Sequence, residues 1–209
     1  MNVYEIFRSL QGETSRVGLP MDFIRLAGCD LACTYCDTPD ARDRAAGREM
    51  TVAEVLSALP SPALQWVMIT GGEPLLQAEA VNALVAALCD VGRRVMVETS
   101  GAYPVEVLDA RAVRIMDVKT PGSGMAERMD WANLEALRPL DEAKFVVTGR
   151  SDYEWACQLV AEKDLAARAI VLFGAARPHL DAKTLAGWIL ADGLPVRLNQ
   201  QLHKSLGIR

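Results

Sequence analysis

The stretch DFIRLAGCDLACTYC, residues 22–36, combines the start of a regular fold with a dense group of cysteines. Its first part, 22–26, is a short and mostly apolar run of the kind that forms a buried strand. Runs of this kind recur along the chain and are expected to be strands. They lie at residues 66–70, 95–99, 113–118, 144–148, 169–173 and 196–198.

Helical patterns separate these runs, at residues 51–59, 77–91, 151–167 and 181–191. The first begins with Thr51 and Glu54, which have the spacing of a capping box. Strands that alternate with helices form parallel sheets. About six βα units are fewer than the eight that close a complete barrel, so we expect an α/β fold with a partial TIM-like barrel rather than an open doubly wound sheet. Residues 39–50 and 120–130 are expected to be surface loops at the carboxyl ends of the strands.

Length, composition and charge restrict the class of protein. A chain of 209 residues, 51% of them hydrophobic, is expected to form one globular domain, residues 1–209. The net charge of −5, with no long basic run, gives no sign of nucleic-acid binding. No stretch is long and apolar enough to span a membrane, and the first residues, MNVYEIFRSLQGE, lack the apolar core of a secretory signal. We therefore expect a cytoplasmic protein that acts on a small molecule.

The second part of the opening stretch places Cys29, Cys33 and Cys36 directly after a strand, where α/β proteins have their active sites. A structural zinc site and a simple electron-carrying iron–sulfur centre use four ligands, and no fourth ligand lies nearby. Three thiolates on a 4Fe-4S cluster leave one iron open for a substrate or cosubstrate. The alternative is a zinc site that borrows a distant histidine or cysteine, and the chain has only two histidines, His179 and His203.

The spacing Cys-x3-Cys-x2-Cys, with Tyr35 before the last cysteine, resembles that of the radical S-adenosylmethionine (SAM) superfamily. There the open iron of the cluster binds SAM, and an electron from the cluster cleaves SAM to a radical. The stretch TGGEP, residues 70–74, is similar to the Gly-Gly-Glu motif that contacts the SAM amino group in that superfamily. Glycines allow close approach of a ligand, and Glu73 adds negative charge near an ammonium. Without the cysteines, this stretch is equally consistent with an ordinary strand-to-helix turn.

Within this superfamily, the chain resembles the 7-carboxy-7-deazaguanine synthase family over nearly its whole length. The segments that carry the resemblance are residues 5–13, 23–29, 36–38, 98–101, 119–125 and 201–204. Members of that family convert 6-carboxy-5,6,7,8-tetrahydropterin to 7-carboxy-7-deazaguanine with release of ammonia, on the route to queuosine and related 7-deazapurines. They need SAM, a 4Fe-4S cluster and Mg²⁺. The resemblance thus implies a radical SAM carbon–nitrogen lyase, with an electron donor such as flavodoxin or ferredoxin, and a homodimer.

The resemblance also implies which residues contact each ligand. Cys29, Cys33 and Cys36 would hold the cluster, and Thr38 would ligate Mg²⁺, which prefers oxygen. The implied SAM contacts are Tyr35, Asp37, Gly72, Glu73, Ser100, Asp117, Val118, Lys119, Gly174 and Ala175. The implied substrate contacts are Leu10, Gln11, Gly12, Glu13, Arg25, Thr70, His203 and Arg209. No catalytic base is assigned, although Glu13 lies in the right neighbourhood.

Arg25 illustrates what the resemblance adds to the pattern. From the pattern alone it is the solvent-side residue of an alternating strand. The resemblance instead makes it the partner of the substrate carboxylate, through a fork of donors that lysine lacks. Two other functions stay open. A glycyl-radical-enzyme activase shares the cysteines and the Gly-Gly-Glu motif but acts on a protein, and a non-catalytic iron–sulfur or zinc module would use the cysteines structurally.

Overall fold

The computed structural model describes residues 1–60 and 63–208, and its centre is a nine-stranded sheet. Arg209, implied above as a substrate contact, lies outside the described residues. The strands are β1 (Asn2–Leu10), β2 (Pro20–Leu26), β3 (Arg48–Glu49), β4 (Trp66–Gly71), β5 (Arg94–Thr99), β6 (Val113–Val118), β7 (Glu142–Val147), β8 (Ile170–Ala175) and β9 (Arg197–Leu198). Their order in the sheet is β3-β1-β2-β4-β5-β6-β7-β8-β9.

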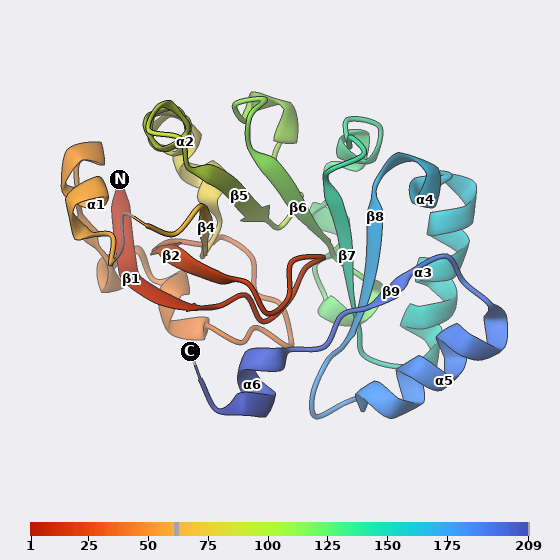
Figure 1. The fold of residues 1–209 in the computed structure, drawn as a ribbon. Helices are drawn as coiled ribbons and strands as arrows, with labels where there is room; N and C mark the ends of the chain where they lie inside the picture. Colours follow the sequence, from red (N-terminus) through yellow and green to blue (C-terminus); the bar gives the residue numbers. More distant parts are fainter. Residues whose placement is uncertain (61–62, 209) are drawn as a thin grey trace.

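The sheet is a barrel that does not close. From β2 to β9 each strand pairs with its neighbour in parallel, whereas β1 pairs antiparallel with both β2 and β3. The sheet curls around an interior, and the larger helices cover its outer side (Figure 1). The prediction of an incomplete α/β barrel is confirmed.

The N-terminal strand β1 is not predicted by the sequence patterns above. Its residues mix apolar side chains with Glu5 and Arg8, and many of them are only partly buried. β1 forms an antiparallel hairpin with β2, in which Leu10 pairs with Pro20. Residues 11–19 form the loop of this hairpin. Two of its side chains contact residues of β7, since Ser15 hydrogen-bonds to Glu142 and Glu13 pairs with Lys144.

The helices are α1 (Val52–Ala58), α2 (Ala78–Asp90), α3 (Arg150–Glu162), α4 (Leu165–Arg168), α5 (Ala182–Asp192) and α6 (Leu202–Leu206). The capping box is confirmed, since Thr51 Oγ1 accepts from the Glu54 amide and the Glu54 carboxylate accepts from the Thr51 amide. The prediction of one helix over 151–167 is wrong, because Asp164 adopts a left-handed φ of 48° between α3 and α4. Among the described helices, none is long and apolar enough to cross a membrane.

Apolar side chains cover both faces of the sheet, as expected where helices lie outside and the interior is enclosed. The larger apolar cluster lies between the sheet and the helices, where Ile69 of β4 packs with Leu84 of α2. A smaller cluster on the inner face consists of Met21, Phe23, Met68, Met96, Val113 and Ile115. Because successive residues of a strand face opposite sides, Met68 and Ile69 belong to different clusters.

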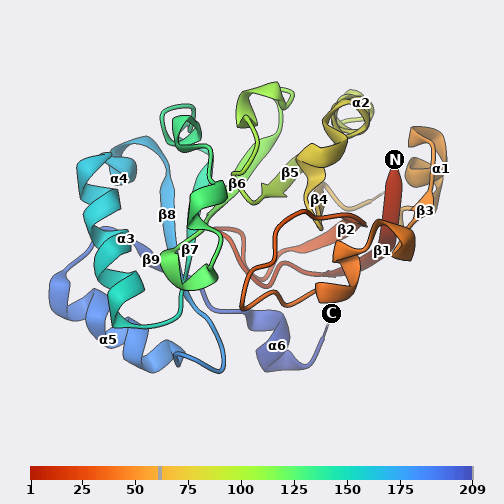
Figure 2. The same ribbon diagram turned by 180° about the vertical axis from the view of Figure 1, so that it is seen from behind.

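The two expected loops both lie beside the cysteine segment (Figure 2). They contain short 3-10 turns, η1 (Pro39–Arg42), η2 (Arg44–Ala46), η5 (Pro121–Ser123) and η6 (Ala126–Arg128). Further 3-10 turns are η3 (Pro74–Gln77), η4 (Val105–Val107) and η7 (Trp131–Leu134). The Gly28 amide donates to Ala41 O at 2.8 Å, and the Thr34 amide donates to Ser123 O at 3.1 Å. The cysteine segment is therefore held between the two loops.

Candidate active site

A cavity of about 250 Å³ opens inside the barrel at the carboxyl ends of the parallel strands. Hairpin loop 11–19 and α6 meet beside it, where the Leu202 amide donates to Gly12 O at 2.8 Å. The residues implied above that line this cavity are Leu10, Gln11, Gly12, Glu13, Arg25, Cys29, Cys33, Tyr35, Cys36, Asp37, Thr38, Thr70, Gly72, Ser100, Asp117, Lys119, Gly174, Ala175 and His203. The fold thus brings segments that are far apart in the sequence to one site.

Two implied SAM contacts, Glu73 and Val118, lie behind the cavity wall. The Glu73 carboxylate is fully buried and accepts from Leu75 N, Thr99 Oγ1 and Ser100 N at 2.7–2.8 Å. Its hydrogen bonds tie the end of β5 to the turn after β4. Val118 is fully buried in the outer apolar cluster. In this geometry both residues support the wall and do not form its surface.

Three cysteines of one loop, Cys29, Cys33 and Cys36, line the cavity, and none of them is in a disulfide. Burial raises the pKa of the Cys29 and Cys33 thiols, so both are protonated at neutral pH without a metal. The loop is anchored where the Tyr103 hydroxyl donates to the Asp30 carboxylate at 2.8 Å. Three unpaired thiols in one loop are a soft donor set of the type that iron–sulfur clusters use.

The cysteine loop and the Gly71-Gly72 pair pack backbone against backbone. The Gly72 amide donates to Leu26 O at 2.9 Å, and the Glu73 amide donates to Gly28 O at 2.7 Å. A Cβ at Gly72 would overlap the Gly28 carbonyl, and Gly71 has a φ of 120°, which L side chains rarely adopt. The two motifs of the sequence therefore form one continuous wall, and only glycine fits at their contact.

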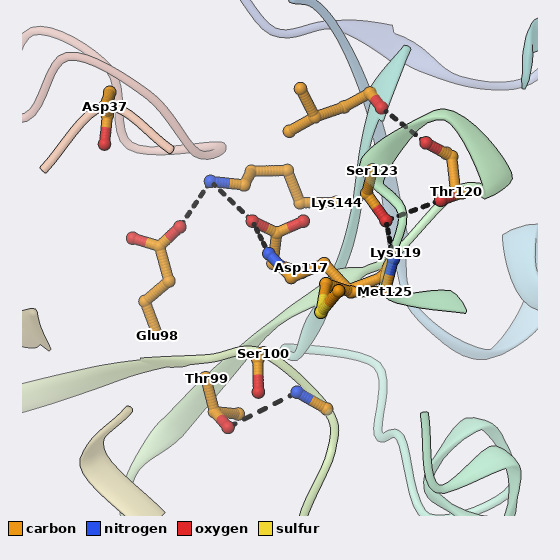
Figure 3. Close-up of polar contacts among 12 residues, drawn as sticks. Asp37, Glu98, Thr99, Ser100, Asp117, Lys119, Thr120, Ser123, Met125 and Lys144 are labelled. Carbon is orange, nitrogen blue, oxygen red and sulfur yellow. Dashed lines mark hydrogen bonds and ion pairs between the residues drawn. The ribbon is translucent and has the colours of Figure 1, made fainter. Parts of the chain in front are cut away.

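Five charged side chains meet on another side of the cavity, and we call them the acidic chamber: Glu13, Glu98, Asp117, Lys119 and Lys144. Lys144 Nζ contacts Glu98 Oε1 closely, Glu13 Oε2 at 3.0 Å and Asp117 Oδ2 at 3.7 Å. Lys119 Nζ pairs with the same Asp117 oxygen at 3.0 Å. Figure 3 shows the Lys144 ammonium between Glu98 and Asp117.

Burial and opposite charge determine the protonation of this chamber. Burial by itself lowers the pKa of Lys144, but the three carboxylates outweigh it and raise that pKa well above the ordinary value. Burial raises the pKa of Glu98 in spite of Lys144. Burial also acts to raise the pKa of Glu13, but Lys144 and Gln201 outweigh it and leave it lowered. Lys144 and Glu13 are thus charged, and Glu98 takes a proton more readily than Glu13.

The sequence reasoning assigned no ligand contact to Glu98 and Lys144, nor to Gln201 and Lys204 at the cavity rim. Glu98 and Lys144 lie within predicted strands, 95–99 and 144–148, and Glu98 also begins one of the segments that carry the family resemblance. A signal was present, because strands of a parallel sheet covered on both faces are expected to be almost entirely apolar. A lysine between Ala143 and Phe145 departs from that pattern and marks an inward-facing polar site.

Arg25 and Thr38 are adjacent on the cavity wall. Arg25 Nε donates to Glu5 Oε1 at 3.0 Å, and its Nη1 donates to Thr38 Oγ1 at 3.2 Å. Thr38 Oγ1 lies 3.2 Å from Asp37 Oδ1. The hydroxyl and carboxylate oxygens here suit Mg²⁺ only if ligand and water oxygens complete its octahedron.

α6 and the residue before it, Gln201, bring three polar side chains to the cavity rim. Gln201 Nε2 donates to Glu13 Oε1 at 2.8 Å, and Lys204 Nζ donates to Asp37 Oδ2 at 3.2 Å. His203 lines the cavity between them, and burial lowers its pKa. Ligand atoms of Glu13, Asp37 and His203 lie within 4.8 Å of one another. The C-terminal segment is therefore part of the site.

Comparison with known proteins shows the family to which the chain belongs. The Radical SAM superfamily matches residues 23–114, which contain the cysteine loop and the glycine pair. The 7-carboxy-7-deazaguanine synthase of Chlorobaculum tepidum is 41% identical, over 98% of this chain and 93% of that protein. The chain belongs to the 7-carboxy-7-deazaguanine synthase family. A further member of this family, from Methanospirillum hungatei, is 39% identical, over 100% of this chain and 86% of that protein.

Solved structures show the same fold. QueE from Escherichia coli superimposes with a TM-score of 0.78, over 97% of this chain and 94% of that chain, at 22% identity. SuiB from Streptococcus suis shares part of the fold, with a TM-score of 0.55 over 82% of this chain and 46% of that chain. The predicted resemblance to the 7-carboxy-7-deazaguanine synthase family is confirmed. Membership of the radical SAM superfamily implies a 4Fe-4S cluster and SAM, and the cysteine loop supplies a fitting donor set.

Proposed function

We propose that this protein converts 6-carboxy-5,6,7,8-tetrahydropterin to 7-carboxy-7-deazaguanine with release of ammonia, using SAM, a 4Fe-4S cluster and Mg²⁺. The observation that carries the proposal is that three unpaired cysteines and the acidic chamber open into one cavity. Relatives named 7-carboxy-7-deazaguanine synthase match nearly the whole chain. The product belongs to 7-deazapurine biosynthesis.

In this proposal Cys29, Cys33 and Cys36 hold the cluster. When bound there, the cluster and SAM supply the one-electron cleavage that starts the radical reaction. The SAM contacts that we propose all line the cavity, and they are Tyr35, Asp37, Gly72, Ser100, Asp117, Lys119, Gly174 and Ala175. Gly71 and Gly72 both line the cavity, so a ligand there would meet a wall of closely packed backbone.

Arg25 and Thr38 would receive the substrate carboxylate and Mg²⁺. A guanidinium can offer two parallel donors to a carboxylate, and a threonine hydroxyl next to Asp37 offers oxygen to a hard cation. The remaining proposed substrate contacts are Leu10, Gln11, Gly12, Glu13, Thr70 and His203. The N–H donors on the pyrimidine edge of the pterin fit the carboxylates of the acidic chamber.

Loss of ammonia requires groups that hold and move protons near the pterin. Lys144 stays protonated, because three carboxylates surround it. We propose that Glu98, whose pKa burial raises, takes or gives the proton, and that Glu13 remains charged and orients the substrate. In this proposal the cavity wall keeps water away from the bound pterin and holds the reacting groups at the distances that the reaction needs.

We also propose that a one-electron carrier such as flavodoxin or ferredoxin reduces the cluster, and that the protein works in the cytoplasm as a homodimer. Cys36 is exposed at the rim, which gives a carrier a short path to the cluster. Apolar side chains on the C-terminal segment, Leu198, Leu206 and Ile208, are exposed and available to a second copy. The activase and the non-catalytic module are not favoured, because full-length relatives carry the synthase name.

The direct test is turnover under anaerobic conditions. Purified protein is reconstituted with iron and sulfide, supplied with SAM, Mg²⁺, dithionite and 6-carboxytetrahydropterin, and the products are identified by mass spectrometry. We expect 7-carboxy-7-deazaguanine from the native chain and none from Cys33→Ala. Cys89→Ala, a change of a partly buried cysteine on α2, is the matched control and retains activity. Cleavage of SAM without this product would refute the substrate and favour the activase.

A further inference from the structure

Asp152 is a buried carboxylate that lies outside the cavity and has no part in the function proposed above. It belongs to the first turn of α3 and is 1% exposed. Its Oδ1 accepts from the Gly122 amide at 2.8 Å. Its Oδ2 accepts from Thr120 Oγ1 at 3.0 Å and from the Thr148 amide and hydroxyl at 3.0 and 2.6 Å. One carboxylate therefore joins α3 to the end of β7 and to the loop that follows β6.

The contact between this loop and Asp152 leaves no free space. A Cβ at Gly122 would overlap both the Asp152 carboxylate and the Thr148 hydroxyl. The backbone of the loop thus lies directly against the carboxylate, at a position that only glycine permits. A buried carboxylate that accepts four local hydrogen bonds is costly to disturb, because each donor would lose its partner.

The other side of the same loop contacts the middle of the cysteine segment. Gly122 O accepts from Thr34 Oγ1 at 2.8 Å, and Ser123 O accepts from the Thr34 amide at 3.1 Å. Thr34 lies between Cys33 and Cys36 in the sequence. Hydrogen bonds therefore run without a gap from Asp152 through residues 122–123 to the segment that carries two of the three thiols.

Internal contacts make the loop a stiff connector. Ser123 Oγ donates to Thr120 O at 2.6 Å and accepts from the Met125 amide at 3.0 Å (Figure 3). Met125 Sδ in turn accepts from the Ala32 amide at 3.3 Å. The loop meets the cysteine segment at two places, on both sides of Cys33, while its base is fixed to Asp152.

We infer that Asp152 is a positioning residue for the cluster-binding loop: acting through residues 120–125, it fixes the segment between Cys33 and Cys36 and so determines how firmly the three thiolates hold the cluster. This inference rests on the proposed 4Fe-4S site. Cys29, at the start of the loop, is fixed separately, since its amide donates to Arg42 O at 3.1 Å.

The test measures cluster release and needs no turnover. Reconstituted protein is mixed anaerobically with an excess of an iron chelator, and the loss of iron–sulfur absorbance is followed with time. We expect Asp152→Asn to release iron up to about 10-fold faster than the native chain, at the lower end of the effect of losing a direct partner of a metal ligand, because Asp152 acts through residues 120–125. The midpoint potential of the cluster, measured on the same samples, is expected to shift as well.

Asp141→Asn is the matched control. Asp141 is also fully buried and accepts from the Arg114 and Arg138 amides at 2.9 and 3.0 Å, but it lies just before β7, at the opposite end of that strand from Thr148. We expect it to lower the free energy of unfolding without changing the release rate. Equal acceleration by both variants would refute the inference, because general loss of stability would then explain release.

Thr34→Val tests the other end of the connection, at an exposed position. We expect faster release from this variant alone and a smaller additional effect of Asp152→Asn in its background. A single variant that releases iron at the native rate would overturn the inference. So would a double variant in which the two effects on the release rate are fully additive. Failure of the native chain to bind any cluster would refute the proposed function and this inference together, whereas a stable native cluster with unchanged variants would refute the inference only.

Discussion

Glu142 and Lys144 are neighbours on the inner face of β7, and both are buried, yet their surroundings differ. The Glu142 carboxylate accepts from Ser15 Oγ at 2.6 Å, from the Ser15 amide, and from Arg16 at 3.0 Å. All of these donors come from hairpin loop 11–19. Lys144 instead meets carboxylates from three different parts of the chain, at the side of the open cavity.

We call Ser15, Arg16, Trp66 and Glu142 the floor of the barrel. Arg16 also lies over the Trp66 ring, 4.6 Å from its centroid, so the one acid of the floor has one cation that is held in place. The acidic chamber has three carboxylates against two ammonium groups. The same sheet thus carries one acid enclosed with one cation in the floor, and a chamber with more carboxylates than cations. A ligand with N–H donors or positive charge would complete the chamber.

Lys144→Met should have the largest effect and would break the chamber alone. Methionine keeps most of the length of the side chain but leaves Glu13, Glu98 and Asp117 without their shared cation. These carboxylates would then no longer hold the pterin in the position that the reaction needs. We expect kcat/KM for the pterin to fall about 100-fold or more, as measured from product formation. Lys163→Met, at a half-exposed lysine that pairs with Glu135, is the control and should leave kcat/KM unchanged. A Lys144→Met variant as active as this control would contradict the account.

Glu142→Gln should affect the floor and spare the chamber. The amide NH₂ would replace one acceptor oxygen and face the donors of Ser15 and Arg16. We expect the free energy of unfolding to fall by about 1–3 kcal/mol, measured with urea, while product formation is unchanged in the folded protein. Glu135→Gln, at an exposed acid on the surface, should cost less than about 0.5 kcal/mol. Loss of activity in step with stability would remove the distinction between floor and chamber.

The pH dependence of stability should separate the two regions further. Burial raises the pKa of Glu142 above the ordinary value of 4.5, so the folded state binds this proton more tightly than the unfolded chain. That contribution is complete below the ordinary pKa and is lost as the pH rises through the raised one. Glutamine does not titrate, so the stability difference between the native chain and Glu142→Gln should shrink as the pH rises.

Urea unfolding at a series of pH values from acid to neutral measures this trend. Lys144, whose pKa is raised well above its ordinary value, stays charged throughout this range and contributes no slope. A difference that grows with pH would show that the Glu142 pKa is lowered and that the floor stabilises the ionised form instead.

Thr51→Ala should have the smallest effect and lies in neither region. It removes the hydroxyl that caps α1 on the outer surface and should lower the free energy of unfolding by about 1 kcal/mol. Activity and the pH trend should match those of the native chain. A measurable loss of turnover here would mean that stability anywhere in the fold limits activity, and the comparison of floor and chamber would lose its meaning.

The parallel part of the fold was predictable because buried parallel strands have short apolar runs that stand out between helices. β1 was not, since its antiparallel pairing at the side of the sheet tolerates Glu5 at a half-buried position and Arg8 at an exposed one. The break at Asp164 was hidden, because helices on both sides of it bury the same kind of apolar residue. Local patterns show which residues are buried, and they do not show where a backbone changes direction.

The cysteines and the glycine pair of the site were predictable because each motif lies within a few consecutive residues. The acidic chamber was not, because Lys144 and Glu98 meet only when β5 and β7 are brought together by the curled sheet. The role inferred for Asp152 depends in the same way on contacts between distant segments. Glu73 was predicted as a SAM contact because it lies in a motif. In the structure it is buried behind the cavity wall and supports that wall through hydrogen bonds to Thr99 and Ser100.

The most direct test of the division between floor and chamber is an anaerobic crystal structure of the protein with cluster, SAM, Mg²⁺ and 6-carboxytetrahydropterin bound. We expect the pterin carboxylate at Arg25 and Thr38, and its N–H edge at Glu13 in the acidic chamber, with the Glu142 contacts to Ser15 and Arg16 unchanged. A pterin bound away from the chamber, or one that displaces hairpin loop 11–19 from Glu142, would contradict the account.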